Sequence, residues 1–259
     1  NQPLAYVHPG AKIAKNVVVE PFTTINNNVE IGEGTWVGSN VTIMEGARIG
    51  KNCFIYPGSV ISGNPQDLKF KGEKTKLEIG DNNLIREYVT INPGTVNGGG
   101  ITKIGNNCLF MVSSHIAHDC YVGNNVILAN NVPLGGHAQI SDEVIIGGNS
   151  AVQQFTRIGK SAMIGGMCGV VRDVIPYGIA HGNRSILQGI NVIGLRRKNF
   201  SNKIIMQLND AYKEIFKNDN LTANIENLSL ELKNSELVKD VVKFLTEDKK
   251  RPICSPFSK

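Results

Sequence analysis

The chain has few aromatic residues and lacks a cysteine pattern that would bind metal or form a disulfide framework. One Trp, six Tyr and nine Phe stand against 28 Gly in 259 residues. The five cysteines are an odd number, and no two form a CxxC pair. The cysteine pattern therefore argues against a disulfide framework and against a zinc knuckle. Abundant glycine with few aromatics predicts many tight turns around a core of small, β-branched side chains.

Long apolar and long basic runs are also missing. No apolar stretch approaches the ~18 residues of a membrane span, and no signal peptide opens the chain, so we expect no transmembrane segment and a cytoplasmic location. No five basic residues run together, which argues against nucleic acid. The net charge of +5 fits an anionic small molecule or an acidic partner protein.

The strongest feature present is an internal repeat of six residues. Every sixth residue is apolar from Val7 to Ile61, again from Ile79 to Ile91 and, one place out of register, from Ile104 to Val170. All twenty-five positions are occupied by Val, Ile, Leu or Phe. With 41% hydrophobic residues overall, chance does not explain this regularity.

A second set of positions, four residues after each large apolar one, mostly carries small side chains. Four of the five cysteines, Cys53, Cys108, Cys120 and Cys168, fall in this set. A period of six fits a short strand plus a corner, with Gly and Asn at the corners because a positive φ costs them little. Three such sides close a triangular coil of eighteen residues, so residues eighteen apart become vertical neighbours.

Two stretches interrupt the repeat, near 62–78 and near 92–103. We expect both to be loops that leave the prism, and such loops usually serve binding. The sequence predicts a parallel β-helix over 1–190 and a C-terminal α-helical domain over 191–259.

The helical prediction rests on apolar residues at helical spacing between 200 and 250. "FSNKIIMQLNDAYKEIF" has Ser201 as a plausible N-cap, and "NSELVKDVVKFLTEDKK" has the same type of pattern. We expect two to four helices here, covering the open end of the prism.

The coil brings chemically reactive residues together. Adding eighteen places His118 beneath Gly136 and Gly136 beneath Gln154, and it places Asp119 beneath His137. We therefore expect one outer patch, made of His115, His118, Asp119, Gly136, His137 and Gln154.

This patch suits acyl transfer. His118 can accept a proton from an alcohol, as histidine titrates near neutral pH. The Gly136 N–H can stabilise an oxyanion, and Asp119 can orient the imidazole. No serine or cysteine is placed as a nucleophile, which favours direct attack by the acceptor. A metal site is the rival interpretation, although the histidine pair is three apart rather than the five of gamma-class carbonic anhydrases.

Six motifs, in "PQDLKF", "HIAHDC", "VGNNVILANN", "GGHAQI", "IIGGNSAVQQF" and "GNRSILQGINVIGLRRKNFS", resemble the bacterial UDP-N-acetylglucosamine acyltransferases of the hexapeptide-repeat family. The resemblance covers nearly the whole chain. It implies a left-handed parallel β-helix, a homotrimer with sites between prisms, and no cofactor or metal. It also implies transfer of an (R)-3-hydroxyacyl chain from acyl carrier protein to the 3-hydroxyl of UDP-GlcNAc, the first step of lipid A synthesis.

The resemblance assigns roles to individual residues. His118 is the base and Gly136 supplies the oxyanion N–H. Gly166 stands where the family sets acyl length, and a glycine there leaves room for about fourteen carbons, our working hypothesis. The remaining assignments are to sugar and acyl chain (Gln66, Asp67, Lys69), to the donor or nucleotide pocket (His115, His137, Gln154) and to the nucleotide (Asn191, Arg196, Arg197).

The sequence departs from the family at Gln153, often histidine, and at Ile193, where an acidic residue is usual. Other readings remain open at this point. They are a 3-amino sugar as acceptor, a zinc-dependent carbonic anhydrase and a β-helix without catalytic activity. The later N-acyltransferase of the same pathway carries an additional N-terminal uridine-binding domain, which we do not expect because the coils begin at Val7.

Overall fold

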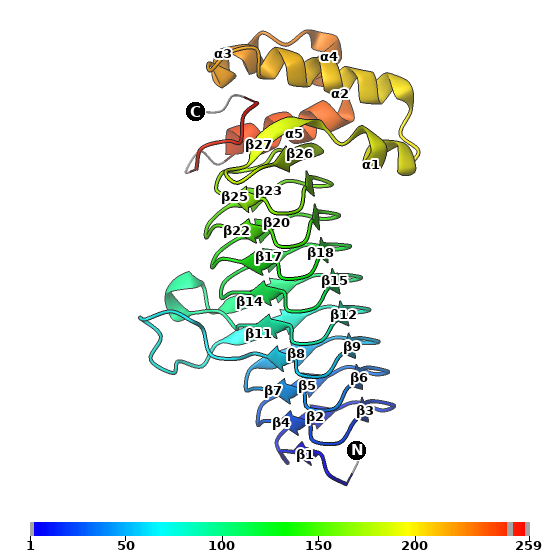
Figure 1. The fold of residues 1–259 in the computed structure, drawn as a ribbon, viewed down its shortest axis with the longest axis vertical. Helices are drawn as coiled ribbons and strands as arrows, with labels where there is room; N and C mark the ends of the chain where they lie inside the picture. The colour runs from blue at the N-terminus through cyan, green and yellow to red at the C-terminus, as the bar shows by residue number, and fades with distance from the viewer. Residues whose placement is uncertain (1–2, 248–250, 257–259) are drawn as a thin grey trace.

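The structure, a computed structural model, is a long triangular prism with helices across one end (Figure 1). It describes residues 3–247 and 251–256. The predicted ranges 1–190 and 191–259 therefore include residues 1–2, 248–250 and 257–259, which lie outside the described part.

Three sheets form the walls of the prism, and they are named here A, B and C. Sheet A contains β1 (Tyr6–Val7), β4 (Thr24–Ile25), β7 (Thr42–Ile43), β10 (Val60–Ile61), β13 (Thr90–Ile91), β16 (His115–Ile116), β19 (Pro133–Leu134), β22 (Ala151–Val152) and β25 (Gly169–Val170). Sheet B contains β2 (Lys12–Ile13), β5 (Glu30–Ile31), β8 (Ala47–Ile49), β11 (Lys76–Ile79), β14 (Ile101–Ile104), β17 (Tyr121–Val122), β20 (Gln139–Ile140) and β23 (Arg157–Ile158). Sheet C contains β3 (Val18–Val19), β6 (Trp36–Val37), β9 (Phe54–Ile55), β12 (Leu84–Ile85), β15 (Leu109–Phe110), β18 (Ile127–Leu128), β21 (Ile145–Ile146), β24 (Met163–Ile164), β26 (Gly178–His181) and β27 (Ile186–Ile190).

The register of the parallel strands confirms the eighteen-residue coil. Thr24 pairs with Thr42, and His115 pairs with Pro133. Each parallel strand of the repeat turns its last residue, which is apolar, inward, and from Val19 to Val170 these inward residues are at most 5% exposed. The predicted cysteine positions are also buried, and all five thiols are free. The repeat thus predicts the core correctly, because one large and one small side chain per side fill the prism.

The corners take the left-handed backbone that the sequence predicts. Asparagines such as Asn40, Asn52 and Asn125 have φ between 53° and 58° there. Their short polar side chains lower the cost of this conformation, which otherwise is about 1–2 kcal/mol per residue.

Both loops leave the prism at the corner between sheets A and B, which we call the loop corner. They span 62–75 and 92–100, so each ends three residues sooner than the predicted 62–78 and 92–103. The difference arises because β11 and β14 are four residues long and pair along their whole length, with Lys76 opposite Ile101. This pairing gives the two loops a shared base.

The end of the prism differs from the simple repeat. After β26 the chain reverses, and β27 pairs with it in antiparallel fashion. The sequence analysis missed this hairpin because the six-residue rhythm has ended by Pro176.

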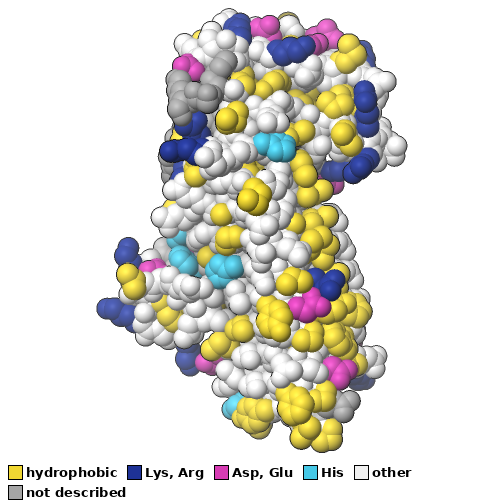
Figure 2. Space-filling model, in the orientation of Figure 1, with side chains coloured by type: hydrophobic (Ala, Val, Ile, Leu, Met, Phe, Trp, Pro, Cys, Tyr) yellow, Lys and Arg dark blue, Asp and Glu magenta, His cyan; other side chains and the backbone are white. Residues whose placement is uncertain are grey.

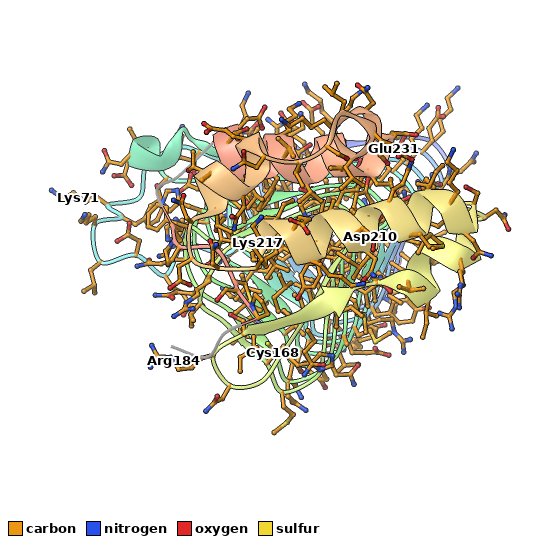
Figure 3. All side chains as sticks on the ribbon, turned by 90° about the horizontal axis from the view of Figure 1, so that it is seen from above. Lys71, Cys168, Arg184, Asp210, Lys217 and Glu231 are labelled. Carbon is orange, nitrogen blue, oxygen red and sulfur yellow. The ribbon has the colours of Figure 1, made fainter. Side chains whose placement is uncertain are left out.

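Helices follow the hairpin: α1 (Val192–Arg197), α2 (Asn202–Ile215), α3 (Leu221–Glu226), α4 (Leu230–Asn234) and α5 (Glu236–Glu247). The Ile204 N–H donates to the Ser201 side chain, so Ser201 is the N-cap of α2 as predicted. Seen along the prism axis, α2 and α5 lie across the end of the coil, while Lys71 marks the loop that stands out from the wall (Figure 3). Within the described residues, none of these helices is long and apolar enough to cross a membrane.

Several side-chain contacts fasten the helices to the prism, and two of them involve α5. The hydroxyl of Tyr177, at the end of the coil, donates to Asp240 of α5. The guanidinium of Arg157 lies 4.3 Å from the ring centre of Phe244, a cation–π geometry.

Candidate active site

The loop corner carries most of the predicted site residues. The polypeptide passes from sheet A to sheet B through 117–120, 135–138 and 153–156 in three consecutive coils, directly beyond the two loops. Histidine side chains gather on this side of the molecule, next to the protruding loops (Figure 2). Asp119, His137 and Phe155 take the left-handed corner position in the three coils, with φ of 59°, 61° and 63°.

His118 and Asp119 form a hydrogen-bonded pair. The Nδ1 atom of His118 lies 2.8 Å from Oδ2 of Asp119. The Asp119 side chain is 1% exposed and that of His118 15%. A carboxylate at Nδ1 favours the tautomer with a proton on that nitrogen, which leaves Nε2 with a lone pair.

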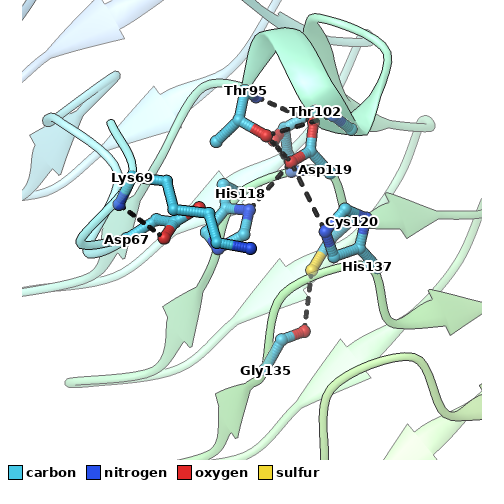
Figure 4. A network of polar contacts seen from close by, with 10 residues as sticks. Asp67, Lys69, Thr95, Thr102, His118, Asp119, Cys120, Gly135 and His137 are labelled. Carbon is cyan, nitrogen blue, oxygen red and sulfur yellow. Dashed lines mark hydrogen bonds and ion pairs between the residues drawn. The ribbon is translucent and has the colours of Figure 1, made fainter. Parts of the chain in front are cut away.

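Neighbouring threonines hold Asp119 in place. The Thr95 N–H donates to Oδ1 at 2.8 Å, and the Thr95 hydroxyl donates to Oδ2 at 2.6 Å. The Asp119 N–H donates to the Thr102 hydroxyl at 2.8 Å. The carboxylate thus has donors at both oxygens and little freedom to rotate (Figure 4).

Gly136 lies directly against the imidazole of His118. A Cβ atom built on Gly136 would be 2.8 Å from both Cε1 and Nε2 of His118. The Gly136 N–H makes no hydrogen bond to any described residue. The free nitrogen of a histidine and an unused backbone donor therefore lie side by side, as the eighteen-residue spacing predicts.

His137 lies on the neighbouring coil. Its ring packs edge-on to His118 at 5.3 Å between centroids and stacks on Phe155 at 4.3 Å. Burial lowers the pKa of His137, although the Asp119 charge opposes this shift. Gln154, exposed on the third coil, has its backbone N close above Gly135.

His115 lies on the outer face of β16, beside the corner. Its Nδ1 is 2.7 Å from the Thr90 hydroxyl on the strand below. Burial is the main cause that lowers the pKa of His115, and the nearby His118 lowers it further. Both effects favour a neutral imidazole at neutral pH.

The first loop brings Asp67 and Lys69 to the site. Figure 4 draws them beside His118, and the charge of Asp67 acts on His137. The Lys69 N–H donates to Oδ1 of Asp67, and Gln66 is exposed on the same loop. The Asn92 side chain holds the loop base by donating to the Gly63 and Asn64 carbonyls at 2.8 and 3.2 Å.

Four predicted residues lie elsewhere in the chain. Gly166 stands at the corner between sheets C and A. Asn191 caps α1 and donates to the Ser161 carbonyl at the corner between sheets B and C. Arg196 and Arg197 are exposed at the end of that helix. One chain therefore distributes the predicted site over three different corners.

Sequence reasoning missed the threonines that hold the site residues, namely Thr95 and Thr102 beside Asp119 and Thr90 beside His115. Each is an ordinary polar residue within a strand or loop. A signal for Thr95 was present, because the repeat slips one place in the loop that contains it.

The side chains of His118, Asp119 and His137 offer ligand atoms within 4.8 Å of one another. This spacing is compatible with a metal ion. However, the Asp119 oxygens already accept from Thr95 and from His118. A metal here would compete with these hydrogen bonds, so the donor set fits a hydrogen-bonded dyad better.

Two family models match the chain. The model of the bacterial transferase hexapeptide matches residues 28–63 and 101–136. A second model, described as UDP-N-acetylglucosamine O-acyltransferase, domain 2, matches residues 173–254.

Curated relatives and solved structures agree with these models. The acyl-[acyl-carrier-protein]–UDP-N-acetylglucosamine O-acyltransferase of Paracoccus denitrificans is 42% identical over 74% of this chain and 73% of its own. That of Sinorhizobium fredii is 44% identical over 76% and 74%. The structure of LpxA from Acinetobacter baumannii is 41% identical, with a TM-score of 0.94 over 97% of this chain and 98% of its own. The enzyme from Campylobacter jejuni is 35% identical, with a TM-score of 0.92 over 98% of each chain. These likenesses confirm the left-handed parallel β-helix with a small helical end.

Proposed function

The chain belongs to the family of acyl-[acyl-carrier-protein]–UDP-N-acetylglucosamine O-acyltransferases, and on that premise we propose how it acts. It transfers an (R)-3-hydroxyacyl chain from acyl carrier protein to the 3-hydroxyl of the sugar in UDP-GlcNAc, the first step of lipid A synthesis. The observation that carries this proposal is the free Nε2 of His118 next to the unused Gly136 N–H, behind a buried carboxylate.

The mechanism follows from these three groups. Nε2 of His118 takes the proton of the sugar hydroxyl as its oxygen attacks the thioester carbonyl. The Gly136 N–H donates to the oxyanion that forms, and Asp119 stabilises the imidazolium through Nδ1–H. When the intermediate collapses, the C–S bond breaks and the carrier thiol leaves with the proton that His118 held.

The other predicted residues bind substrates in this proposal. Gln66, Asp67 and Lys69 reach over the reacting centre from the first loop, and His115, His137 and Gln154 line the donor or nucleotide pocket. Arg196 and Arg197 suit phosphate because a guanidinium donates in bidentate fashion, with Asn191 beside them. Gly166 leaves the acyl groove open. We also infer a cytoplasmic location, with which the free thiols agree.

We propose a homotrimer because sheet C presents an apolar outer face. Its outward side chains form one column up the prism: Val18, Trp36, Phe54, Leu84, Leu109, Ile127, Ile145 and Met163. The corresponding column of sheet B is mostly charged or polar, with Lys12, Glu30, Arg48, Glu78, Lys103, Tyr121, Gln139 and Arg157. A long apolar stripe on a soluble surface marks an interface. Association of copies also offers a way to complete a site that one chain distributes over three corners.

A transfer assay tests the proposed reaction. Purified protein is incubated with UDP-GlcNAc and hydroxyacyl carrier proteins of ten to sixteen carbons, and the acylated nucleotide is measured. We expect a preference near fourteen carbons and a loss of roughly 10²–10⁴-fold in His118→Ala. His8→Ala is the matched control, since His8 occupies the same corner in the first coil. Undiminished transfer by His118→Ala would refute the role of His118 as the base. Faster transfer to a 3-amino sugar nucleotide would show that the acceptor is an amine and not a hydroxyl.

Light scattering tests the trimer. Ile145→Asp places a charge on the apolar column and should yield monomers, whereas Tyr121→Asp on sheet B should remain trimeric. The two side chains are 37% and 51% exposed in the single chain, so neither substitution disturbs the core. A wild-type mass of one chain, or a trimer that tolerates Ile145→Asp, would contradict the proposed interface.

A further inference from the structure

The second loop covers the carboxylate of Asp119. This loop, 92–100, contains a short 3₁₀ turn, η1 (Val96–Gly98), with Thr95 as its N-cap. Asp119 belongs to a coil corner, the most exposed part of a β-helix, yet its side chain is 1% exposed. The loop is therefore the part of the chain that removes this carboxylate from solvent.

Thr95 makes the direct contact. Its N–H donates to one carboxylate oxygen and its hydroxyl to the other. The same hydroxyl accepts from the Gly98 N–H at 3.2 Å, so its rotation is set from both sides. Thr95 is 7% exposed, and hydrogen bonds to a charged group are stronger when they are shielded from water.

Gly98 allows the loop to lie this close. A Cβ atom at this position would be 2.1 Å from both Cγ and Oδ2 of Asp119. Any other residue would push the loop away from the carboxylate or turn the carboxylate away from His118. The glycine is needed here for its size, since its φ does not lie in the left-handed region.

We propose that Thr95 and Gly98 are positioning residues for the His118 base, acting through Asp119. The inference rests on the proposed function. The hydroxyl and N–H of Thr95 fix the plane of the carboxylate, and this plane determines where the Nδ1–H of His118 points. The direction of Nε2 toward the acceptor hydroxyl follows from it. The second loop, which shifts the repeat by one residue, thus fixes the position of the His118–Asp119 pair.

Kinetics of Thr95 variants test the proposal. Thr95→Val keeps the shape but loses the hydroxyl, and we expect kcat to fall roughly tenfold, a fraction of what general-base catalysis supplies, with KM for both substrates unchanged. Thr95→Ser should restore most of kcat. Thr156→Val is the matched control, because the Thr156 hydroxyl is also buried but has no hydrogen-bond partner among the residues that the structure describes. Its kcat and KM should equal those of the wild type.

Gly98→Ala is the second variant and acts by steric displacement. It should lower kcat more than Thr95→Val does, while the thermal unfolding temperature and oligomeric mass show that the protein remains folded. If the wild type transfers acyl chains but Thr95→Val and Gly98→Ala keep full kcat, the positioning role is refuted and the proposed function stands. Equal kcat losses in Thr95→Val and Thr95→Ser, or a rise in KM alone, would also refute it. An inactive wild type would instead refute the proposed function.

Discussion

Gly136→Ala is the substitution that most directly tests the contact between the base and the oxyanion donor. The added methyl group would stand 2.8 Å from Cε1 and Nε2 of His118, whereas ordinary contact begins at 3.4 Å. The imidazole must therefore move by about 0.6 Å. It cannot move freely, because Nδ1 is bonded to Asp119 and the ring packs edge-on against the His137 ring.

The expected loss follows from this displacement. A misplacement of about 1 Å at a reacting centre can cost roughly 10²-fold, so a shift of this size should lower kcat by about 10–100-fold. The backbone N–H of residue 136 remains, and its φ is not in the left-handed region. We therefore expect no large change in stability.

A double-mutant cycle separates this effect from simple blockage of the substrate. Transfer rates are measured for wild type, Gly136→Ala, His118→Ala and the double variant. If the methyl group acts by moving the imidazole, it should cost little once His118 has been removed. An equal loss in both backgrounds would show that the methyl group obstructs the substrate instead, and the geometric reasoning would be wrong.

Three further predictions concern pH, domain docking and metal. Folding lowers the pKa of His115 and of His137, so as the pH falls the unfolded chain binds protons before the folded chain does. The free energy of unfolding should therefore be highest above about pH 7 and decrease once the pH drops below about 6.5, the usual histidine pKa in an unfolded chain. Thermal unfolding should follow this trend, and it should do so less steeply in His115→Gln. Tyr177→Phe loses the bond to Asp240 and should destabilise the helical end by about 1–2 kcal/mol, measured by denaturant unfolding with Tyr212→Phe as control. Treatment with a chelator should leave the rate of acyl transfer unchanged, and metal analysis should find no stoichiometric zinc in the purified protein. Loss of activity that only zinc restores would favour the metal site instead.

The fold could be predicted almost completely because its information is local. Each side of the coil needs one large residue such as Ile25 and one small residue such as Cys53, and the spacing records both. The antiparallel strand β27 escaped prediction, since it pairs after the rhythm has ended. The strand extensions in β11 and β14 escaped for a related reason. They are stabilised by pairing with each other across an insertion, and spacing alone does not reveal such a pairing.

The candidate site could be predicted only for residues that lie in the regular coils. Spacing brings His118 to Gly136 because both lie in the regular part of the prism. It gives no position for Thr95 or Lys69, which lie on loops of irregular backbone. The resemblance to a family supplied Gly166 and Arg196, but a single chain does not bring them to His118. In our proposal the association of copies brings them to the site, and a repeat within one chain cannot encode such an association.

Departures from asparagine and glycine at the left-handed corner positions extend this reasoning. At the corner between sheets B and C, the exceptions Glu143 and Ser161 bond to Lys198, and Tyr177 bonds to Asp240. At the loop corner they are the site residues Asp119 and His137 and, stacked on His137, Phe155. At the corner between sheets C and A they include Phe22, Tyr88 and Met167, which are 61%, 66% and 74% exposed. A bulky residue in this backbone is strained, so each position needs a contact that justifies the strain. The first two corners have such contacts within the chain. At the third corner the Tyr88 ring lies over Gly58, yet the three apolar side chains remain exposed beside the apolar face of sheet C. The third corner is therefore where we expect the next copy to pack.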